Sequence, residues 1–129
     1  MPHTAHNPPS IAAPIGPYSH AIEISAGARL LHVAGQVGIK ADGSVPKSCA
    51  EQCEVVWQNL VAILKSAGMG PSHITKMNTY LINAADFAVA GPIRVKYLKD
   101  HKPASTGVCV TALARPEFLI EIEVYAAKG

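Results

Sequence analysis

Charged side chains are scarce in this 129-residue chain: Asp, Glu, Lys and Arg together make up 16% of it, against about 25% in typical soluble domains. Aromatic residues reach only 5%, whereas apolar residues reach 49%. That apolar share excludes a disordered chain, and the scattered Gly and Pro exclude a collagen-like one. So few charges cannot cover an isolated globule, and we expect part of the surface to be buried against another subunit.

Several targeting and binding signals are also missing. The net charge is only +2, which argues against binding to nucleic acid or to an anionic membrane. No run of about 18 apolar residues could span a bilayer, and the N-terminus has no apolar signal region. The three cysteines form neither a Cys-x-x-Cys pair nor a zinc-type set. We therefore predict a cytoplasmic protein with no disulfide framework, metal or membrane partner.

Hydrophobic periodicity predicts one domain over residues 1–129 with the order β-β-α-β-α-β-β. Prolines make residues 1–17 unsuited to a helix or a central strand, and we expect 1–13 to be a loose N-terminal segment. The strands are expected at 21–26, 30–34, 73–82, 105–113 and 119–126. The first two have the spacing of a hairpin. The second strand is expected to continue through a bulge over Gly35-Gln36-Val37-Gly38.

The start and stop signals are clear for the first predicted helix, whereas the second is interrupted. The first follows Ser48, which forms a capping box with Glu51, and ends at Gly68. The second, at 83–99, is interrupted by Gly91-Pro92, where we expect a kink or a restart. Both helices can lie on one face of a mixed sheet, which is an α+β fold. The other face is then left for a second chain to cover.

Two carboxylates on the last predicted strand are candidates for chemistry. In this alternating run, Glu121 and Glu123 face the side opposite the aliphatic residues. Carboxylates that gather in a cleft often have a catalytic role. The simpler interpretation is that both face solvent or form ion pairs.

Small residues on the neighbouring predicted strand form a second candidate. Ser105, Gly107 and Cys109 share one face, and beside Glu121 they would leave room for a small molecule or for a close-packed interface. Cys109 has no identifiable base to form a thiolate, so a small buried side chain is its simpler interpretation. We expect Glu121 and Ser105 to share one rim where neighbouring copies meet.

Cations cluster at the end of the second predicted helix. They are Arg94, Lys96, Lys99, His101 and Lys102. Such residues suit a helix C-terminus, where the dipole favours positive charge. RNA binding is the weaker interpretation, because neither the net charge nor an aromatic stacking surface supports it.

Six short motifs follow one another along residues 14–126. They are Pro14-Ile15-Gly16-Pro17-Tyr18-Ser19-His20-Ala21-Ile22, Val33-Ala34-Gly35-Gln36-Val37-Gly38, Asn59-Leu60 with Ala67-Gly68, Lys76 to Leu81, Pro103-Ala104, and Ile120-Glu121-Ile122-Glu123. In order and spacing they resemble the YjgF/RidA family of reactive-intermediate deaminases.

The resemblance implies a chorismate-mutase-like α+β fold and a homotrimer, in which the sheets form a central barrel with small-molecule clefts between subunits. Active members hydrolyse imines and enamines, such as 2-aminoacrylate, to keto acids and ammonia without a cofactor. An arginine there binds the substrate carboxylate. A glutamate and a tyrosine help to place water and substrate.

Carried over residue by residue, the resemblance gives catalytic roles to Glu121 and Tyr18. The substrate-binding candidates are Ser105, Thr106, Gly35, Ala34 and Cys109. The arginine does not carry over, because Ser105 stands in its place, and Gly91 replaces a helix asparagine of the deaminase branch. A serine has no charge and no fork of donors, and one lost charge-assisted contact costs about 1.5–3 kcal/mol.

Two functions stay open on this evidence. The first is a cofactor-free enzyme that hydrolyses a small imine, enamine or related C–N bond, with Glu121 orienting or deprotonating water and Tyr18 closing the pocket. The second is a non-catalytic trimer that binds a small metabolite. Endoribonuclease activity, which is attached to the family by name, ranks lowest.

Overall fold

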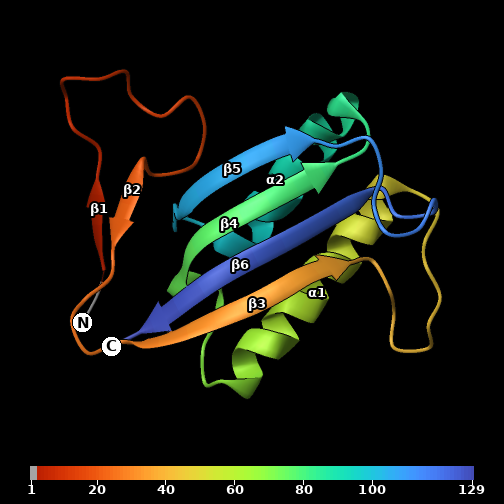
Figure 1. The fold of residues 1–129 in the computed structure, drawn as a ribbon, viewed down its shortest axis with the longest axis horizontal. Coiled ribbons are helices and arrows are strands. Elements are labelled where there is room, and N and C mark those ends of the chain that lie inside the picture. Colours follow the sequence, from red (N-terminus) through yellow and green to blue (C-terminus); the bar gives the residue numbers. More distant parts are fainter. Residues whose placement is uncertain (1–2) are drawn as a thin grey trace.

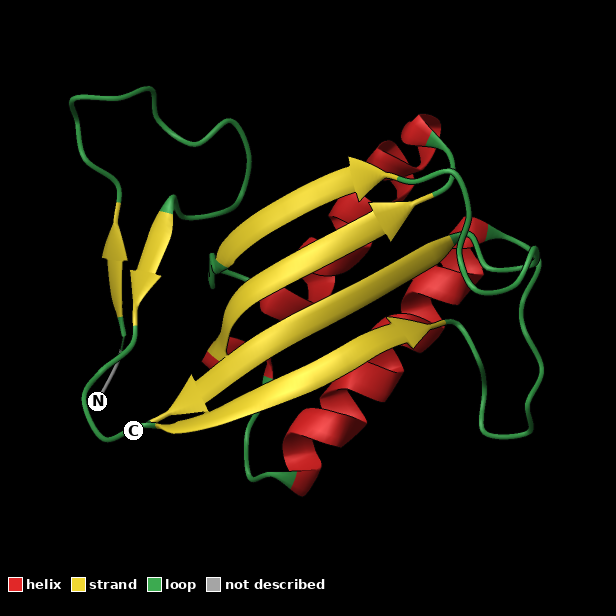
Figure 2. Ribbon diagram, viewed as in Figure 1, coloured by secondary structure: helices red, strands yellow, loops and turns green. Residues whose placement is uncertain are grey.

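A computed structural model describes residues 3–129 and contains a four-stranded mixed sheet in the order β3-β6-β4-β5 (Figure 1). The strands are β3 (Arg29–Val37), β4 (Ile74–Leu81), β5 (Ala104–Cys109) and β6 (Ile120–Lys128). β6 pairs antiparallel with both β3 and β4, and β5 runs parallel to β4. Helices α1 (Cys49–Ser66) and α2 (Phe87–Leu98) cover one face of this sheet (Figure 2). The predicted α+β architecture, with two helices on one face of a mixed sheet, is confirmed.

The N-terminal segment forms a separate two-stranded sheet (Figure 1). β1 (Thr4–His6) pairs antiparallel with β2 (Ala21–Glu23), so a strand occurs where the sequence predicted none. The prolines still fit, because β1 ends before Pro8 and lies at an edge.

The predicted hairpin of 21–26 with 30–34 is wrong, because β2 pairs with β1 and β3 pairs with β6. His3 bridges two segments in this arrangement. Its Nδ1 accepts a hydrogen bond from the Ser25 N–H at 3.1 Å, and its Nε2 donates to the Ala127 carbonyl at 2.9 Å. These bonds join the chain after β2 to the end of β6.

α1 forms where the sequence predicts it. The Ser48 hydroxyl accepts a hydrogen bond from the Glu51 N–H at 3.2 Å and caps the helix. Its buried face carries Trp57, Leu60 and Leu64, all fully enclosed. Burying each such side chain contributes about 1.5–3 kcal/mol relative to leaving it exposed, so the packing of α1 on the sheet contributes substantially to the stability of the fold.

α2 differs from its prediction at Gly91-Pro92. The chain enters through a short 3-10 turn, Ala84–Asp86, and the α-helix then runs through Pro92 without a restart. Pro92 removes one N–H from the helical ladder. Both Pro92 and Ala88, whose carbonyl loses that partner, are exposed, so water can replace the missing bond.

The second face of the sheet has no helix over it. Polar residues occupy it: Glu123 accepts hydrogen bonds from Asn78 Nδ2 at 2.9 Å and from the Tyr80 hydroxyl at 2.7 Å. Exposed apolar side chains stand among them, including Val108 and Tyr125. We call this surface the open face. None of the helices within residues 3–129 is long and apolar enough to cross a bilayer.

Candidate functional site

A cavity of about 310 Å³ lies between α2 and the sheet, beside the edge strand β5. One side of α2 forms its wall, because residues three and four apart face the same way. These wall residues are Phe87, Ala90, Gly91 and Arg94. Ser105 and Gly107 of β5 stand opposite, and the apolar floor is made by Trp57, Met77 and Ile122. We call this space the α2 cavity.

Arg94 is the only charged residue among those that line the α2 cavity. Its Nη1 donates to the Ser105 hydroxyl at 2.9 Å, and its Nη2 donates to the Pro17 carbonyl at 3.0 Å. Its Nε is buried and has no hydrogen-bond partner within residues 3–129. Burial lowers the pKa of the guanidinium, although an arginine still carries its charge at neutral pH. The cation is therefore only partly satisfied by the protein.

Tyr18 reaches the α2 cavity from the segment that precedes β2. Ser19 anchors that segment, because its N–H donates to the Pro103 carbonyl at 3.1 Å, just before β5 begins. The Tyr18 hydroxyl accepts a 3.4 Å hydrogen bond from the Ile15 N–H. The structure thus brings Tyr18 and Ser105, two of the predicted site residues, to one cavity.

Glu121 lies on the opposite face of the sheet from Ser105. The β4–β5 register pairs Ser105 with Met77, a fully buried core residue, so Ser105 faces the helices. Thr106 faces the other way and accepts a hydrogen bond from Lys76 Nζ at 2.8 Å on the open face. The expectation that Ser105 and Glu121 share one rim is therefore wrong within a single chain, because alternation along β5 has the opposite phase.

Glu121 instead lies over Gly35 of β3. A Cβ at position 35 would come within 2.8 Å of the Glu121 Cδ atom, so a side chain there would displace the carboxylate from this position. The ladder between β3 and β6 changes register between Val33 and Gln36, which confirms the predicted bulge. The exposed Ala34 lies within this bulge.

The cysteines contribute little to the α2 cavity or to the surroundings of Glu121. Cys109 is exposed at the end of β5 and does not line the α2 cavity, which contradicts its interpretation as a small buried side chain. Cys49 and Cys53 are buried, and burial raises the pKa of each thiol to about 12, so both stay protonated at neutral pH. No group of three or more His, Cys, Asp or Glu side chains in residues 3–129 could hold a metal ion.

The predicted cation cluster divides in the structure. Lys96 pairs with Glu54 of α1, outside the α2 cavity, whereas Arg94 turns into it. Sequence reasoning assigned Arg94 to the helix dipole and missed this position. The available signal was spacing: Arg94 lies three residues after Gly91 and seven after Phe87, on the apolar side of α2.

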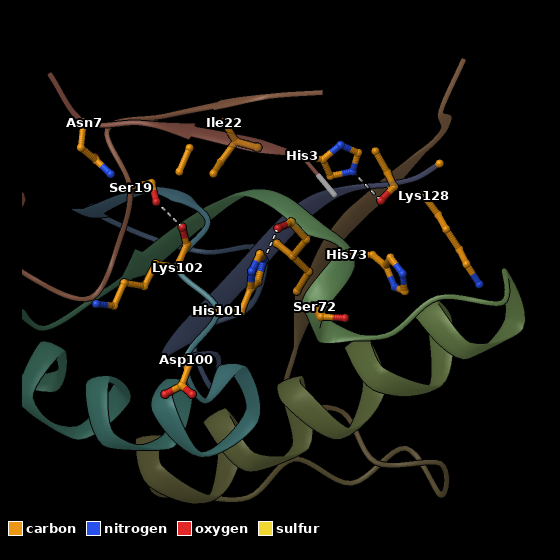
Figure 3. Close-up of a pocket in the computed structure, with 14 residues that line it drawn as sticks. His3, Asn7, Ser19, Ile22, Ser72, His73, Asp100, His101, Lys102 and Lys128 are labelled. Carbon is orange, nitrogen blue, oxygen red and sulfur yellow. Dashed lines mark hydrogen bonds between the residues drawn. The ribbon is translucent and has the colours of Figure 1, made fainter. Parts of the chain in front are cut away.

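A larger cavity, of about 670 Å³, separates the N-terminal segment from the end of the four-stranded sheet (Figure 3). Histidines line it, but backbone groups engage them: His3 Nε2 bonds the Ala127 carbonyl, and His101 Nε2 lies 2.6 Å from the Ile74 carbonyl. Lys128 Nζ also donates to a backbone carbonyl, at 2.8 Å. These contacts join segments of the chain, and we place the candidate site in the α2 cavity.

His73 in this larger cavity predicts a pH dependence of stability. Burial, and then the nearby Lys128 charge, lower the pKa of His73 below its ordinary 6.5, while Nδ1 accepts a bond from the Gly70 N–H at 2.9 Å. The unfolded chain then binds more protons around pH 6, so stability is full above 6.5 and falls as the pH drops below it. Thermal melts at pH 7.5 and 5.5 should show this loss, and His73→Asn should reduce it. An unchanged pH dependence in the variant would contradict this role.

The fold and the α2 cavity define a small α+β domain with one partly buried cation facing a largely apolar space. The family described as Endoribonuclease L-PSP matches residues 9–128. A RutC family protein of Pyrococcus horikoshii is 37% identical over 117 residues, covering 89% of this chain and 90% of that protein. The chain belongs to the YjgF/RidA family.

Two further relatives show how the family compares. A Rid family protein of unknown function from Yersinia pestis has a solved structure with a TM-score of 0.89 at 32% identity, covering 99% of this chain and 100% of its own. A protein of Dermatophagoides farinae named 2-iminobutanoate/2-iminopropanoate deaminase is 25% identical over 117 residues, covering 89% of this chain and 88% of its own.

Proposed function

We propose that this chain is a cofactor-free hydrolase of a small imine or enamine and that the reaction takes place at the α2 cavity. The observation that carries the proposal is the convergence of Tyr18, Ser105 and the Arg94 guanidinium on one largely apolar cavity of small-molecule size. The relative named as an imine deaminase supports this reaction class.

Glu121 enters the proposal through a second copy of the chain. Within one chain the Glu121 side chain lies on the open face, away from the cavity. We propose a homotrimer in which the open face of one copy packs beside the β5 edge of its neighbour, so that Glu121 of one copy borders the α2 cavity of the next. The scarcity of charge and the uncovered sheet face, with its exposed Val108 and Tyr125, support such a buried interface.

The reaction needs one water and no redox partner. Glu121 accepts a proton as water attacks the C=N carbon, and the imine nitrogen takes up that proton, which gives a neutral carbinolamine. That intermediate expels ammonia when its nitrogen is protonated and the C–O bond becomes a carbonyl, so imine and water give a carbonyl product and ammonia. An enamine first takes a proton on carbon to become the imine. A general base of this kind contributes about 10²- to 10⁴-fold.

A non-catalytic metabolite binder is the second candidate. The α2 cavity of one chain contains no carboxylate and no histidine among its lining residues. A single chain therefore offers a cavity that could bind an anion but has no side chain that could act as general base. Endoribonuclease activity has less support, because the cavity walls are mostly apolar and the net charge is only +2.

Ammonia release tests the proposal. The wild-type protein should accelerate ammonia formation from freshly generated 2-aminoacrylate or from a carboxylate-free imine, and light scattering should give three times the 13.5 kDa chain mass. A trimer without turnover of either substrate would favour the binder. A monomer would contradict the placement of Glu121 at a neighbour's cavity.

A further inference from the structure

The α2 cavity contains a cation at a position that the family resemblance does not assign. We infer that Arg94 binds the carboxylate of the substrate, in place of the arginine that β5 lacks, and that the cavity selects carboxylates with a branched or ring-shaped apolar group. The inference rests on the proposed site and deepens it by naming the substrate class.

Arg94 has no counter-ion within the described part of the chain. The ion pairs of residues 3–129 join His6 to Glu23, Lys96 to Glu54 and Arg115 to Glu117, and no carboxylate lines the α2 cavity. A partly buried charge without a partner is unfavourable. An anion that enters the cavity would supply the missing charge where water screens it least.

The guanidinium also has donors to spare. Two of its N–H groups are engaged, one by the Ser105 hydroxyl and one by the Pro17 carbonyl. A guanidinium has five, so Nη1 and Nη2 each keep one. These two contacts also fix the orientation of the planar group, which favours binding of a carboxylate by two parallel hydrogen bonds.

Space lies beside the cation. Gly91 is one turn before Arg94 on α2, and a Cβ added there would meet nothing within 4 Å. Ser105 is short, so the strand leaves the guanidinium room that a longer side chain at 105 would take. The cavity beside the Arg94 guanidinium is therefore open enough to admit a carboxylate.

The apolar lining of the cavity determines which apolar group of the ligand binds well. Phe87 stands over Gly107, where a Cβ would come within 2.8 Å of its ring, and Trp57 and Ile122 complete an apolar floor. Acetate would leave these walls uncovered, whereas a branched or ring-shaped group would bury them. Each buried methylene adds roughly fourfold to affinity, so 3-methylbutanoate should bind more tightly than acetate by tenfold or more.

Trp57 allows a binding test that needs no turnover, because it is the only tryptophan of the chain. Its fluorescence, checked by calorimetry, is titrated with 3-methylbutanoate, with its neutral isostere 3-methylbutanamide and with acetate. The wild-type protein should prefer the carboxylate to the amide by about tenfold or more. Equal affinity for carboxylate and amide, or no binding at all, would overturn the inference.

Variants separate charge recognition from a structural role. Arg94→Gln should lower affinity for 3-methylbutanoate by about 10- to 150-fold and affinity for the amide by less than about twofold, whereas Lys96→Gln, a neighbouring cation outside the cavity, should change neither. Arg94→Lys, which keeps the charge but loses the fork, should fall between. The double variant Arg94→Ser with Ser105→Arg should regain carboxylate preference. If Arg94→Gln keeps the preference, the inference fails.

The two proposals can fail separately. Carboxylate preference that depends on Arg94, without ammonia release from either 2-aminoacrylate or a carboxylate-free imine, would uphold the anion site and favour the binder over the hydrolase. Ammonia release that Arg94→Gln leaves unchanged would uphold the hydrolase and overturn the role of Arg94.

Discussion

Glu121→Gln is expected to lower kcat/KM for imine hydrolysis by about 10²- to 10⁴-fold, which is the contribution of a general base. Glutamine keeps the size and the hydrogen-bonding shape of the side chain but cannot take a proton from water. The space over Gly35 that admits the carboxylate also admits the amide, so the fold and the melting temperature should hardly change. Steady-state ammonia release, measured on both proteins at equal concentration, gives the comparison.

Glu123→Gln is the matched control for this experiment. Glu123 is on the same strand and the same face, two residues along, but the Tyr80 hydroxyl and the Asn78 amide hydrogen-bond its carboxylate and lower its pKa. Such a carboxylate is a weaker base and is already engaged. Its replacement should leave kcat/KM within a few fold of wild type. Equal losses in the two variants would show that the open face tolerates neither change and that Glu121 has no special role.

Gln52→Met is expected to destabilise the protein by about 2–4 kcal/mol, because it leaves three backbone groups without their partner. Gln52 is fully buried on α1. Its Nε2 donates to the carbonyls of Pro46 and Glu117, both at 2.8 Å, and its Oε1 accepts from the Leu119 N–H at 2.9 Å. One side chain therefore ties both loops at this end of the sheet to the helix.

Gln58→Met tests whether that loss comes from the buried contacts. Gln58 belongs to the same helix but is exposed, and exposed substitutions of this kind change stability by less than about 0.5 kcal/mol. Denaturant unfolding of the two variants and the wild type, monitored by circular dichroism, measures the difference. A Gln52→Met loss no larger than that of Gln58→Met would contradict the bridging role.

The sequence predicts a helix or strand best where interactions within that segment determine it. The cap at Ser48 and the apolar spacing of α1 predict that helix almost to the residue, because capping and amphipathicity act within it. The hairpin of β2 with β3 fails for the opposite reason. The observed pairing of β2 with β1 and of β3 with β6 comes with contacts between distant segments, such as those of His3 with Ser25 and Ala127, and no local pattern reports such contacts.

The candidate site divides in the same way. Tyr18 and Ser105 were identified and do meet at one cavity. The sequence did not show which residues of β5 face the helices. Small residues alternate there with Thr106 and Val108, and neither group has the apolar character of a core face. Arg94 was missed because five cations end one helix, and composition alone does not say which of them turns inward.

Mixed assemblies of two variants give the most direct test that the cavity of one copy works with Glu121 of another. Arg94→Gln and Glu121→Gln, each weakly active alone on 2-aminoacrylate, are unfolded together, refolded and assayed. Random assembly should place an intact Arg94 and an intact Glu121 in about one cleft in four, so the mixture should regain about a quarter of the wild-type rate. A mixture no more active than its components would contradict a site built from two copies.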